Sequence, residues 1–283
     1  MAATSLVPFF LLVGYLSVPA RAFLPRVNLA SGDSTTLDHT LITKKGFLKP
    51  LIYFFRDNPQ YLRGEYLTGF LYDILASESP TAFQETVDNI SPQIQFLNAL
   101  NEIQTANVEV DSFPLNTSAS AHFDGEQFKQ GSKRLIQLRQ ELITSLLQGD
   151  KLQHARNLAG SALHTLQDFY SHSNWLELAN PGPYDVLGKP GSEIPQEFIA
   201  GPTEATCKSC TLEPQSGLTD GSCENNLDTV KLTSGYRSGQ DIKKPENLRK
   251  CSHGGRSDES RLKPAAGGIN KDSTSIKQSP HAR

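Results

Sequence analysis

Apolar residues recur at helical spacing from about residue 37 to residue 178, and polar residues fill the positions between them. Residues three or four apart lie on one face of an α-helix, so this pattern predicts amphipathic helices. It divides into six segments, 41–55, 66–75, 83–87, 94–103, 127–147 and 151–178. No stretch before residue 180 shows sustained apolar-polar alternation with β-branched enrichment. We therefore expect a mainly α domain, 23–180, with several helices around one core.

The pattern changes after residue 180. Glycine, proline, serine and charged residues dominate 181–283, and apolar residues stand singly there. We expect this part to be an irregular, disulfide-held extension that is partly disordered in isolation towards its end. One large domain and an extension agree with a length of 283 residues.

The chain opens with an apolar run, 6–18, which is followed by Pro19 and the small-x-small triplet 20–22. Such a run is too short to span a bilayer comfortably, and a cleavage-like triplet follows it at once. Ala-Ala-Thr-Ser stands after Met1 in place of the usual positive charge. We expect residues 1–22 to be a signal peptide cleaved after Ala22, and the mature product to be secreted, without a transmembrane segment.

Export changes the interpretation of the four cysteines, which all lie in the last third of the chain: Cys207, Cys210, Cys223 and Cys251. In an oxidising compartment an even number favours two disulfides, and four cysteines allow three connectivities. A structural zinc site is the alternative, although only 207–210 forms a Cys-x-x-Cys knuckle. Export also makes Asn116 a candidate glycosylation site, and Asn89 a weaker one because Pro92 follows its triplet.

The charge balance gives no reason to expect nucleic-acid binding. The formal net charge is −3 and the pI is near 6.2, whereas nucleic-acid-binding faces are basic. A metal-dependent phosphodiesterase stays compatible with this charge, because its ions would themselves attract phosphate.

One helical segment carries the strongest candidate chemistry. His164, Asp168 and His172 follow one another at steps of four residues, and each step leaves the side chain only about 40° further around an α-helix. Two imidazoles and a carboxylate then share one face. This set suits zinc, since both groups are good ligands and a carboxylate can bridge two ions. The alternative is a histidine hydrogen-bond network that fixes packing. Asn174 and Glu177 lie just beyond and are candidates to orient an imidazole.

Further candidate ligands lie elsewhere in the chain. His122 and Asp124 stand in a polar loop before segment 127–147, and they complete the candidate metal set with the helix residues. Asp38 and His39 open the first segment, where Asp38 is equally suited to cap a helix. His253 follows Cys251. Taken alone, each of these residues is explained as an exposed polar residue or a helix cap. It becomes a candidate metal ligand only if the fold brings it to the His164 helix.

Four motifs carry a resemblance to a known family: His-Phe-Asp at 122–124, the aromatic segment 162–175, Lys-Cys-Ser-His-Gly-Gly at 250–255, and Gly-Gly-Ile-Asn-Lys-Asp at 267–272. Together they resemble the amino-terminal region of the von Willebrand factor A domain-containing protein 7 family, a region similar to fungal heterokaryon incompatibility protein C (Het-C). The resemblance covers nearly the whole mature chain. It implies a truncated form, because the family pattern continues into another helix and an A domain.

Het-C-like domains look like distant relatives of the all-helical zinc-dependent phospholipases C and single-strand nucleases, whose trinuclear sites use a His-x-x-x-Asp helix. The resemblance implies that fold, and it places His164 and Asp168 on that helix motif and His172 on its Het-C-like form. Three features depart from those enzymes, which place their next histidine further along than His172. The mature chain would begin at Phe23 where they begin with tryptophan, and their second motif, His-x-x-x-Glu, is not found. Glu177 follows His172 by five positions, about 140° around the helix.

Two functions are compatible with these observations. The first is a secreted, non-catalytic binding or scaffold module with an unidentified extracellular partner, whose histidine helix holds a structural zinc ion or a hydrogen-bond network. The second is a secreted zinc-dependent phosphodiesterase or phospholipase-C-like hydrolase, in which zinc lowers the pKa of bound water and polarises the phosphoryl oxygen. The sequence favours the first, because the set of candidate ligands is small for a multinuclear enzyme.

Overall fold

The computed structural model describes residues 23–24, 37–57, 94–178, 182–206 and 229–246, together with residues 248, 250 and 269. Within this part the α-helices are α1 (His39–Asp57), α4 (Ile94–Glu109), α5 (Phe128–Gln148) and α6 (Leu152–His172). Short 3-10 helices are η5 (Leu115–Thr117), η6 (Ala119–Ala121) and η7 (Gln196–Phe198). Strands β1 (Phe23–Leu24) and β2 (Leu37–Asp38) pair in parallel, with Phe23 opposite Leu37. The fold is therefore mainly α, as the apolar spacing predicts.

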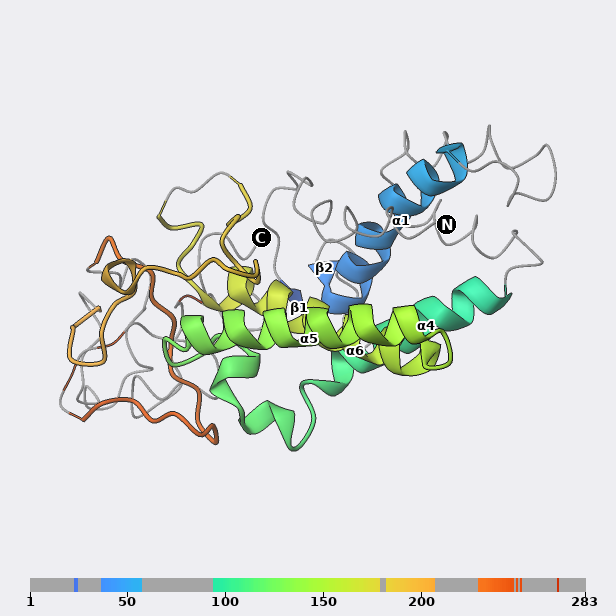
Figure 1. Cartoon of the computed structure of the whole chain (residues 1–283). Helices are drawn as coiled ribbons and strands as arrows, with labels where there is room; N and C mark the ends of the chain where they lie inside the picture. The colour runs from blue at the N-terminus through green and yellow to red at the C-terminus, as the bar shows by residue number, and fades with distance from the viewer. Residues whose placement is uncertain are drawn as a thin grey trace.

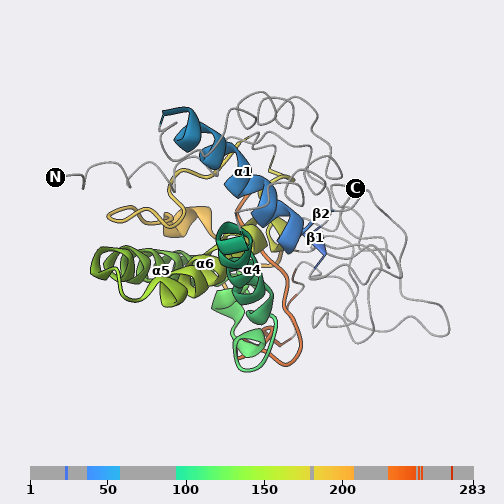
Figure 2. The ribbon, with the colours of Figure 1, turned by 90° about the vertical axis from the view of Figure 1, so that its right-hand side faces the viewer.

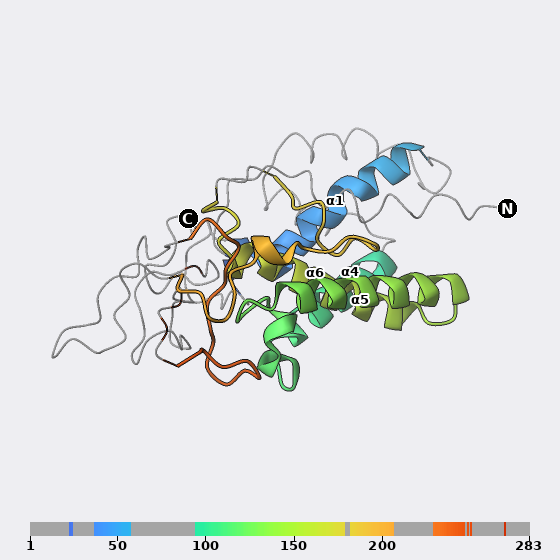
Figure 3. The same cartoon turned by 60° about the vertical axis from the view of Figure 1, so that its left-hand side comes forward.

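Helix α6 is the central helix of the described part, because it packs along both α4 and α5. Figure 1 shows α5 and α6 running side by side. Figure 2 shows α4 nearly end-on beside them and α1 crossing obliquely. In Figure 3 residues 229–246, drawn in orange, lie at one end of the α5 and α6 pair. Residues on α6 can thus meet side chains from several distant parts of the chain.

Helices α5 and α6 form a hairpin with a sharp turn. Gly149 ends α5 in the left-handed region, at φ 75°, a conformation that glycine adopts without the steric cost of a Cβ. Leu142, Ala155 and Leu158 then form a small buried cluster between the two helices. No helix of the described part is long and apolar enough to cross a membrane.

The close approach of α4 and α6 depends on Gly160. A Cβ at this position would lie 2.2 Å from the backbone oxygen of Ile103 and 2.8 Å from the Cβ of Ala106. We expect Gly160→Ala to lower the free energy of unfolding by about 1–3 kcal/mol, because the two helix backbones must separate. Gly46 on α1 is the matched control, since a Cβ there meets nothing within 4 Å. Urea unfolding should show no loss for Gly46→Ala, and an unchanged Gly160→Ala variant would contradict this packing.

The main hydrophobic core joins the helices to the irregular segments that follow them. Phe123, Phe128 and Phe169 meet Trp175 in this core, and Ile194, Ile199 and Leu232 complete it. Residues 229–246, which we call the strap, pass over the end of α6. Ser234 of the strap bridges to Ser173, and Leu232 bridges to Ile199. The described residues beyond position 181 therefore pack into the same core as the helices.

Helices α4 and α6 end at residues other than the predicted ones. Helix α4 continues to Glu109, six residues beyond the predicted segment. Helix α6 ends at His172, not at residue 178, because Ser173 is extended and pairs with the strap. Asn174 does not orient an imidazole; its side chain bonds the backbone of Lys231 and Thr233. The predicted segments 66–75 and 83–87 lie outside the described residues.

Candidate metal centre

Helix α6 turns three titratable side chains into the interior. His164, Asp168 and His172 are exposed by only 0%, 1% and 2%. One carboxylate oxygen of Asp168, Oδ2, lies 2.9 Å from His164 Nε2, and the other, Oδ1, lies 3.9 Å from His172 Nε2. The steps of four residues therefore place a carboxylate between two imidazoles.

The loop between η6 and α5 brings two further groups to this helix. His122 Nδ1 lies 2.7 Å from Asp168 Oδ2 and 3.2 Å from His164 Nε2. Asp124 Oδ1 lies 3.1 Å from His172 Nδ1. Phe123, between them, has a positive φ of 55° and points into the hydrophobic core. The structure thus gathers all five candidate ligands named from the sequence, and both loop residues are fully buried rather than exposed polar residues.

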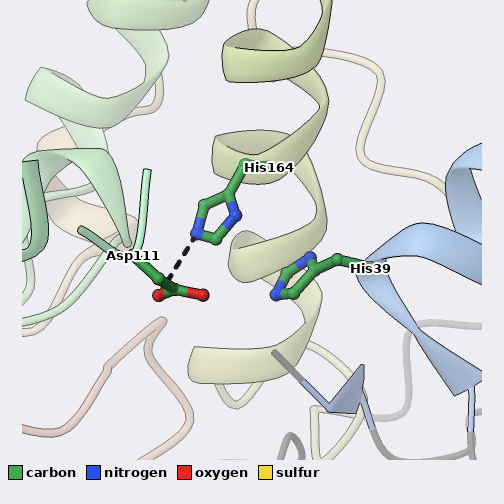
Figure 4. A group of neighbouring side chains, drawn as sticks. All are labelled: His39, Asp111 and His164. Carbon is green, nitrogen blue, oxygen red and sulfur yellow. Dashed lines mark ion pairs between the residues drawn. The ribbon is translucent and has the colours of Figure 1, made fainter. Parts of the chain in front are cut away.

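Two more residues join the cluster from other elements. His39, at the start of α1, has its Nε2 3.4 Å from Asp168 Oδ1, and its ring stacks on His164 with centroids 4.4 Å apart. Asp111 follows α4, and its Oδ1 lies 3.8 Å from His164 Nε2. Figure 4 shows the two histidines and Asp111 converging from α1, α6 and the turn after α4. Asp111 is 24% exposed and is the most accessible of the seven residues.

Side-chain amides fix the rings of two histidines. His39 Nδ1 lies 2.6 Å from Gln167 Oε1, and His164 Nδ1 lies 3.3 Å from Asn107 Oδ1. The amide nitrogen of Asn107 donates to Gln167 Oε1, which assigns both amide oxygens as acceptors. Each imidazole must then donate from Nδ1 and present Nε2 to the cluster. Metal-binding histidines are oriented by this kind of outer hydrogen bond.

The pKa values follow from this crowding. Burial alone would raise the pKa of Asp168, but the charges of His164 and His172 and hydrogen bonds from His122 and His164 hold it well below its usual value. Burial lowers the pKa of His164 despite the neighbouring Asp168. Burial also acts to lower the pKa of His122, but the hydrogen bond and charge of Asp168 outweigh it, so this pKa is raised. The cluster therefore contains an ionised carboxylate and imidazoles of different basicity.

Two overlapping groups within this cluster could hold a metal ion. His122, His164 and Asp168 form one group, and His39, Asp111 and His164 form the other; within each, the ligand atoms lie within 4.8 Å of one another. Among the described residues, Asp168 Oδ1, Asp111 Oδ2 and His122 Nε2 are buried without a hydrogen-bond partner. Buried polar atoms of this kind cost free energy unless something compensates them, and a cation would do so.

The remaining sequence candidates lie elsewhere. Asp38 caps α1 by accepting a hydrogen bond from the backbone nitrogen of Leu41 at 2.6 Å. His253 and the four cysteines fall outside the described residues. Sequence reasoning missed Asp111, Asn107 and Gln167. Gln167 lies three residues after His164 on the same helix, and this spacing could have indicated that it lies near the cluster. Asp111 and Asn107 have no such signal in the sequence.

The strap holds the loop that carries His122 and Asp124. Gln240 donates to Asp124 Oδ2 at 2.7 Å, and the backbone nitrogen of Gly125 donates to Gly235 at 2.7 Å. Glu126 accepts hydrogen bonds from the hydroxyl groups of Thr233 and Tyr236. Each of its carboxylate oxygens also accepts a hydrogen bond from Lys250 Nζ at 2.9 Å. Thus residues more than 100 positions further along the chain position the loop.

Comparison with known proteins identifies the family. The family model described as the VWA7 N-terminal domain matches residues 77–283. The chain belongs to this family. The matched residues include six of the seven members of the cluster, and His39 precedes them.

Full-length relatives of the VWA7 N-terminal domain extend well beyond it. The chain is 36% identical over 286 residues to mouse von Willebrand factor A domain-containing protein 7, covering 97% of this chain and 29% of the relative. The rat protein is 36% identical over 288 residues, covering 98% and 30%. The human protein is 34% identical over 276 residues, covering 96% and 29%. The chain therefore spans less than a third of the length of these relatives. No solved structure matches it.

Proposed function

We propose that this VWA7 N-terminal domain is a secreted, non-catalytic binding module that holds zinc in its histidine and aspartate cluster. The observation that carries the proposal is the position of His164 Nε2. Nε2 lies 2.9 Å from Asp168 Oδ2, while Asn107 accepts from the opposite nitrogen, Nδ1. Either a proton or a metal ion must therefore lie between Nε2 and the carboxylate. Because burial disfavours protonation of His164, a metal ion satisfies this requirement better than a proton.

The donor set indicates which metal and which residues. Zinc binds imidazole nitrogen and carboxylate oxygen together. His122, His164 and Asp168 would hold the ion, and His39 and Asp111 offer a second position that shares His164. His172 would support the first group through its contacts with Asp168 and with the backbone oxygen of His122, and Asp124 would do so through its contact with His172. Zinc in such a site contributes directly to folding stability.

Burial supports a structural role in preference to a catalytic one. Six of the seven cluster residues are at most 2% exposed, and the seventh, Asp111, is 24% exposed. A substrate would have to reach the ion past this single accessible residue. The proposal therefore assigns the zinc to holding α1, α6 and the loop of His122 together.

Removal of the metal tests this role. We expect a chelator to lower the unfolding temperature of the protein, and added zinc to restore it. A ligand at 1,000 times its Kd stabilises a protein by about 4 kcal/mol, so the change should be large. Magnesium is the control, because it prefers all-oxygen sites and should not restore stability. An unfolding temperature that is the same with and without chelator would contradict the proposal.

The pH dependence of zinc binding should follow from the raised pKa of His122. Below that pKa the metal-free protein carries a proton on His122, and zinc must displace it. We expect the apparent zinc affinity to fall as the pH is lowered through and below this raised value, by about tenfold per unit for one displaced proton. Competition titration with a zinc dye between pH 6 and 8 measures this, and a pH-independent affinity would contradict it.

A second candidate function is a zinc-dependent phosphoester hydrolase of the distant phospholipase C and nuclease type. The observation that favours it is that two potential ligand groups share His164, because paired metal ions are common in such enzymes. The zinc-loaded protein should be assayed on a phosphodiester and on phospholipid vesicles. Our proposal predicts no hydrolysis above that of an Asp168→Asn variant, and turnover lost in that variant would favour the enzyme.

The export part of the proposal rests on the sequence of residues 1–22, which lie outside the described residues. Cleavage after Ala22 would leave Phe23, the first residue of β1, at the new amino terminus. Amino-terminal sequencing of protein from the medium should therefore begin near Phe23. Retention of Met1 in a cytosolic product would contradict export.

A further inference from the structure

A compact turn follows α4 and exposes one aromatic side chain. The backbone nitrogen of Asn116 donates to Ser112 at 3.0 Å, and that of Thr117 donates to Pro114 at 3.1 Å. The backbone nitrogen of Asp241, in the strap, donates a hydrogen bond to the backbone oxygen of Thr117 at 2.8 Å. The turn is thus held from within and from the strap, yet Phe113 is 83% exposed.

The carboxamide of Asn116 is oriented with its oxygen inward. Asn116 Oδ1 is buried without a hydrogen-bond partner. The amide nitrogen, Nδ2, is not among the buried atoms that lack a partner, and within the described part of the chain Asn116 bonds only through its backbone. Nδ2 is therefore both accessible to solvent and unbonded. An asparagine in this orientation can carry a substituent on nitrogen without disturbing the turn.

We propose that Asn116 is N-glycosylated and that Phe113 packs against the first sugar of the glycan. Asn116, Thr117 and Ser118 form the acceptor triplet Asn-x-Ser. The donor is a lipid-diphosphate-linked oligosaccharide. A bond forms between Asn116 Nδ2 and the anomeric carbon of the first N-acetylglucosamine, the bond from that carbon to the phosphate oxygen breaks, the lipid diphosphate leaves, and Nδ2 loses one proton.

The position of Phe113 connects it to this glycan. The hydrogen bond from the backbone nitrogen of Asn116 to Ser112 closes a five-residue turn, 112–116. Phe113 and Asn116 therefore belong to the same closed turn. A single exposed phenylalanine needs no explanation by itself. Beside a glycosylated asparagine, however, its ring offers an apolar surface to the apolar face of a pyranose, and both surfaces leave water.

This inference rests on the export part of the proposed function, because the donor is used in the secretory pathway. The experiment tests glycosylation of Asn116 separately from export by residues 1–22. Residues 1–22 are replaced by a secretory leader of established cleavage, so that the chain enters the pathway whether or not its own leader works. The secreted chain is then treated with a peptide N-glycosidase, and the change in mass is measured. The native leader is tested in parallel, and its failure alone would overturn export and leave the glycan result standing.

Variants assign the glycan to its site. We expect a mass shift that is lost in Asn116→Gln and in Ser118→Ala and kept in Asn89→Gln. We also expect Phe113→Ala to lower the occupied fraction and to lower the unfolding temperature of the glycosylated form only. Replacing Ser118 by threonine in the Phe113→Ala background should restore occupancy but not the unfolding temperature. An unmodified secreted chain, or a shift that survives Asn116→Gln, would overturn the site. Equal stability of the glycosylated Phe113→Ala chain would overturn the packing.

Discussion

Asp168→Asn is expected to destabilise the protein by about 3–5 kcal/mol, the usual cost of breaking a buried charge pair. The carboxylate is 1% exposed, and His39, His122 and His164 all approach its oxygens. An amide keeps the size of the side chain but removes the negative charge, and it turns an NH2 group towards imidazole nitrogens. The same change removes one of the proposed zinc ligands, so the variant should also fail to gain stability from zinc.

Denaturant unfolding with and without zinc measures both effects. Asp150→Asn is the matched control, because Asp150 is exposed in the turn between α5 and α6, and its loss should be within about 0.5 kcal/mol. Unfolding of Asp168→Asn at the same denaturant concentration as the unaltered chain would contradict this expected loss.

Lys250→Met is expected to produce a loss of similar size, again about 3–5 kcal/mol, because it leaves the buried carboxylate of Glu126 without its cation. Lys250 is 0% exposed, and its Nζ also donates to the backbone oxygen of Gly201 at 2.6 Å. Burial already raises the pKa of Glu126, against the effect of Lys250. Without the lysine, Glu126 can become neutral by taking up a proton, so the loss should be smaller at low pH than at neutral pH.

The double variant Lys250→Met with Glu126→Gln should be more stable than Lys250→Met alone, because no charge is then buried. The exposed pair of Lys231 and Glu204 provides the control: their side chains are 38% and 35% exposed. Lys231→Met should cost about 0–1 kcal/mol. Equal losses for the buried and the exposed lysine would contradict the view that Lys250 stabilises the loop of His122 through Glu126.

The helices were predictable because their apolar spacing is local. The predicted segment 127–147 differs by one residue at each end from α5, and the spacing of His164, Asp168 and His172 correctly placed them on one face. The end of α6 was not predictable. The apolar pattern continues through Trp175, but the pairing of Ser173 with Ser234, 61 positions further along, overrides it.

The complete cluster could not be derived from local pattern. His39 and Asp111 reach His164 only because α1, α4 and α6 pack together, and no spacing in the sequence links them. Asn107 is an amide without a distinctive motif, and the spacing of Gln167 from His164 does not indicate its partner; their roles become visible only in their bonds to His164 and His39. His122 and Asp124 were found because two chemically suitable residues stood together, although the loop gave no indication of its burial.

The metal content of the purified secreted chain tests the central claim most directly. It should be measured by plasma mass spectrometry after preparation without chelators, beside a His164→Ala, Asp168→Ala double variant whose helical content is checked by circular dichroism. His154→Ala is the matched control, because His154 is exposed on the same helix. We predict stoichiometric zinc in the unaltered chain and in His154→Ala, and none in the double variant. A metal-free unaltered chain, or zinc that persists in a folded double variant, would contradict the assignment of zinc to this cluster.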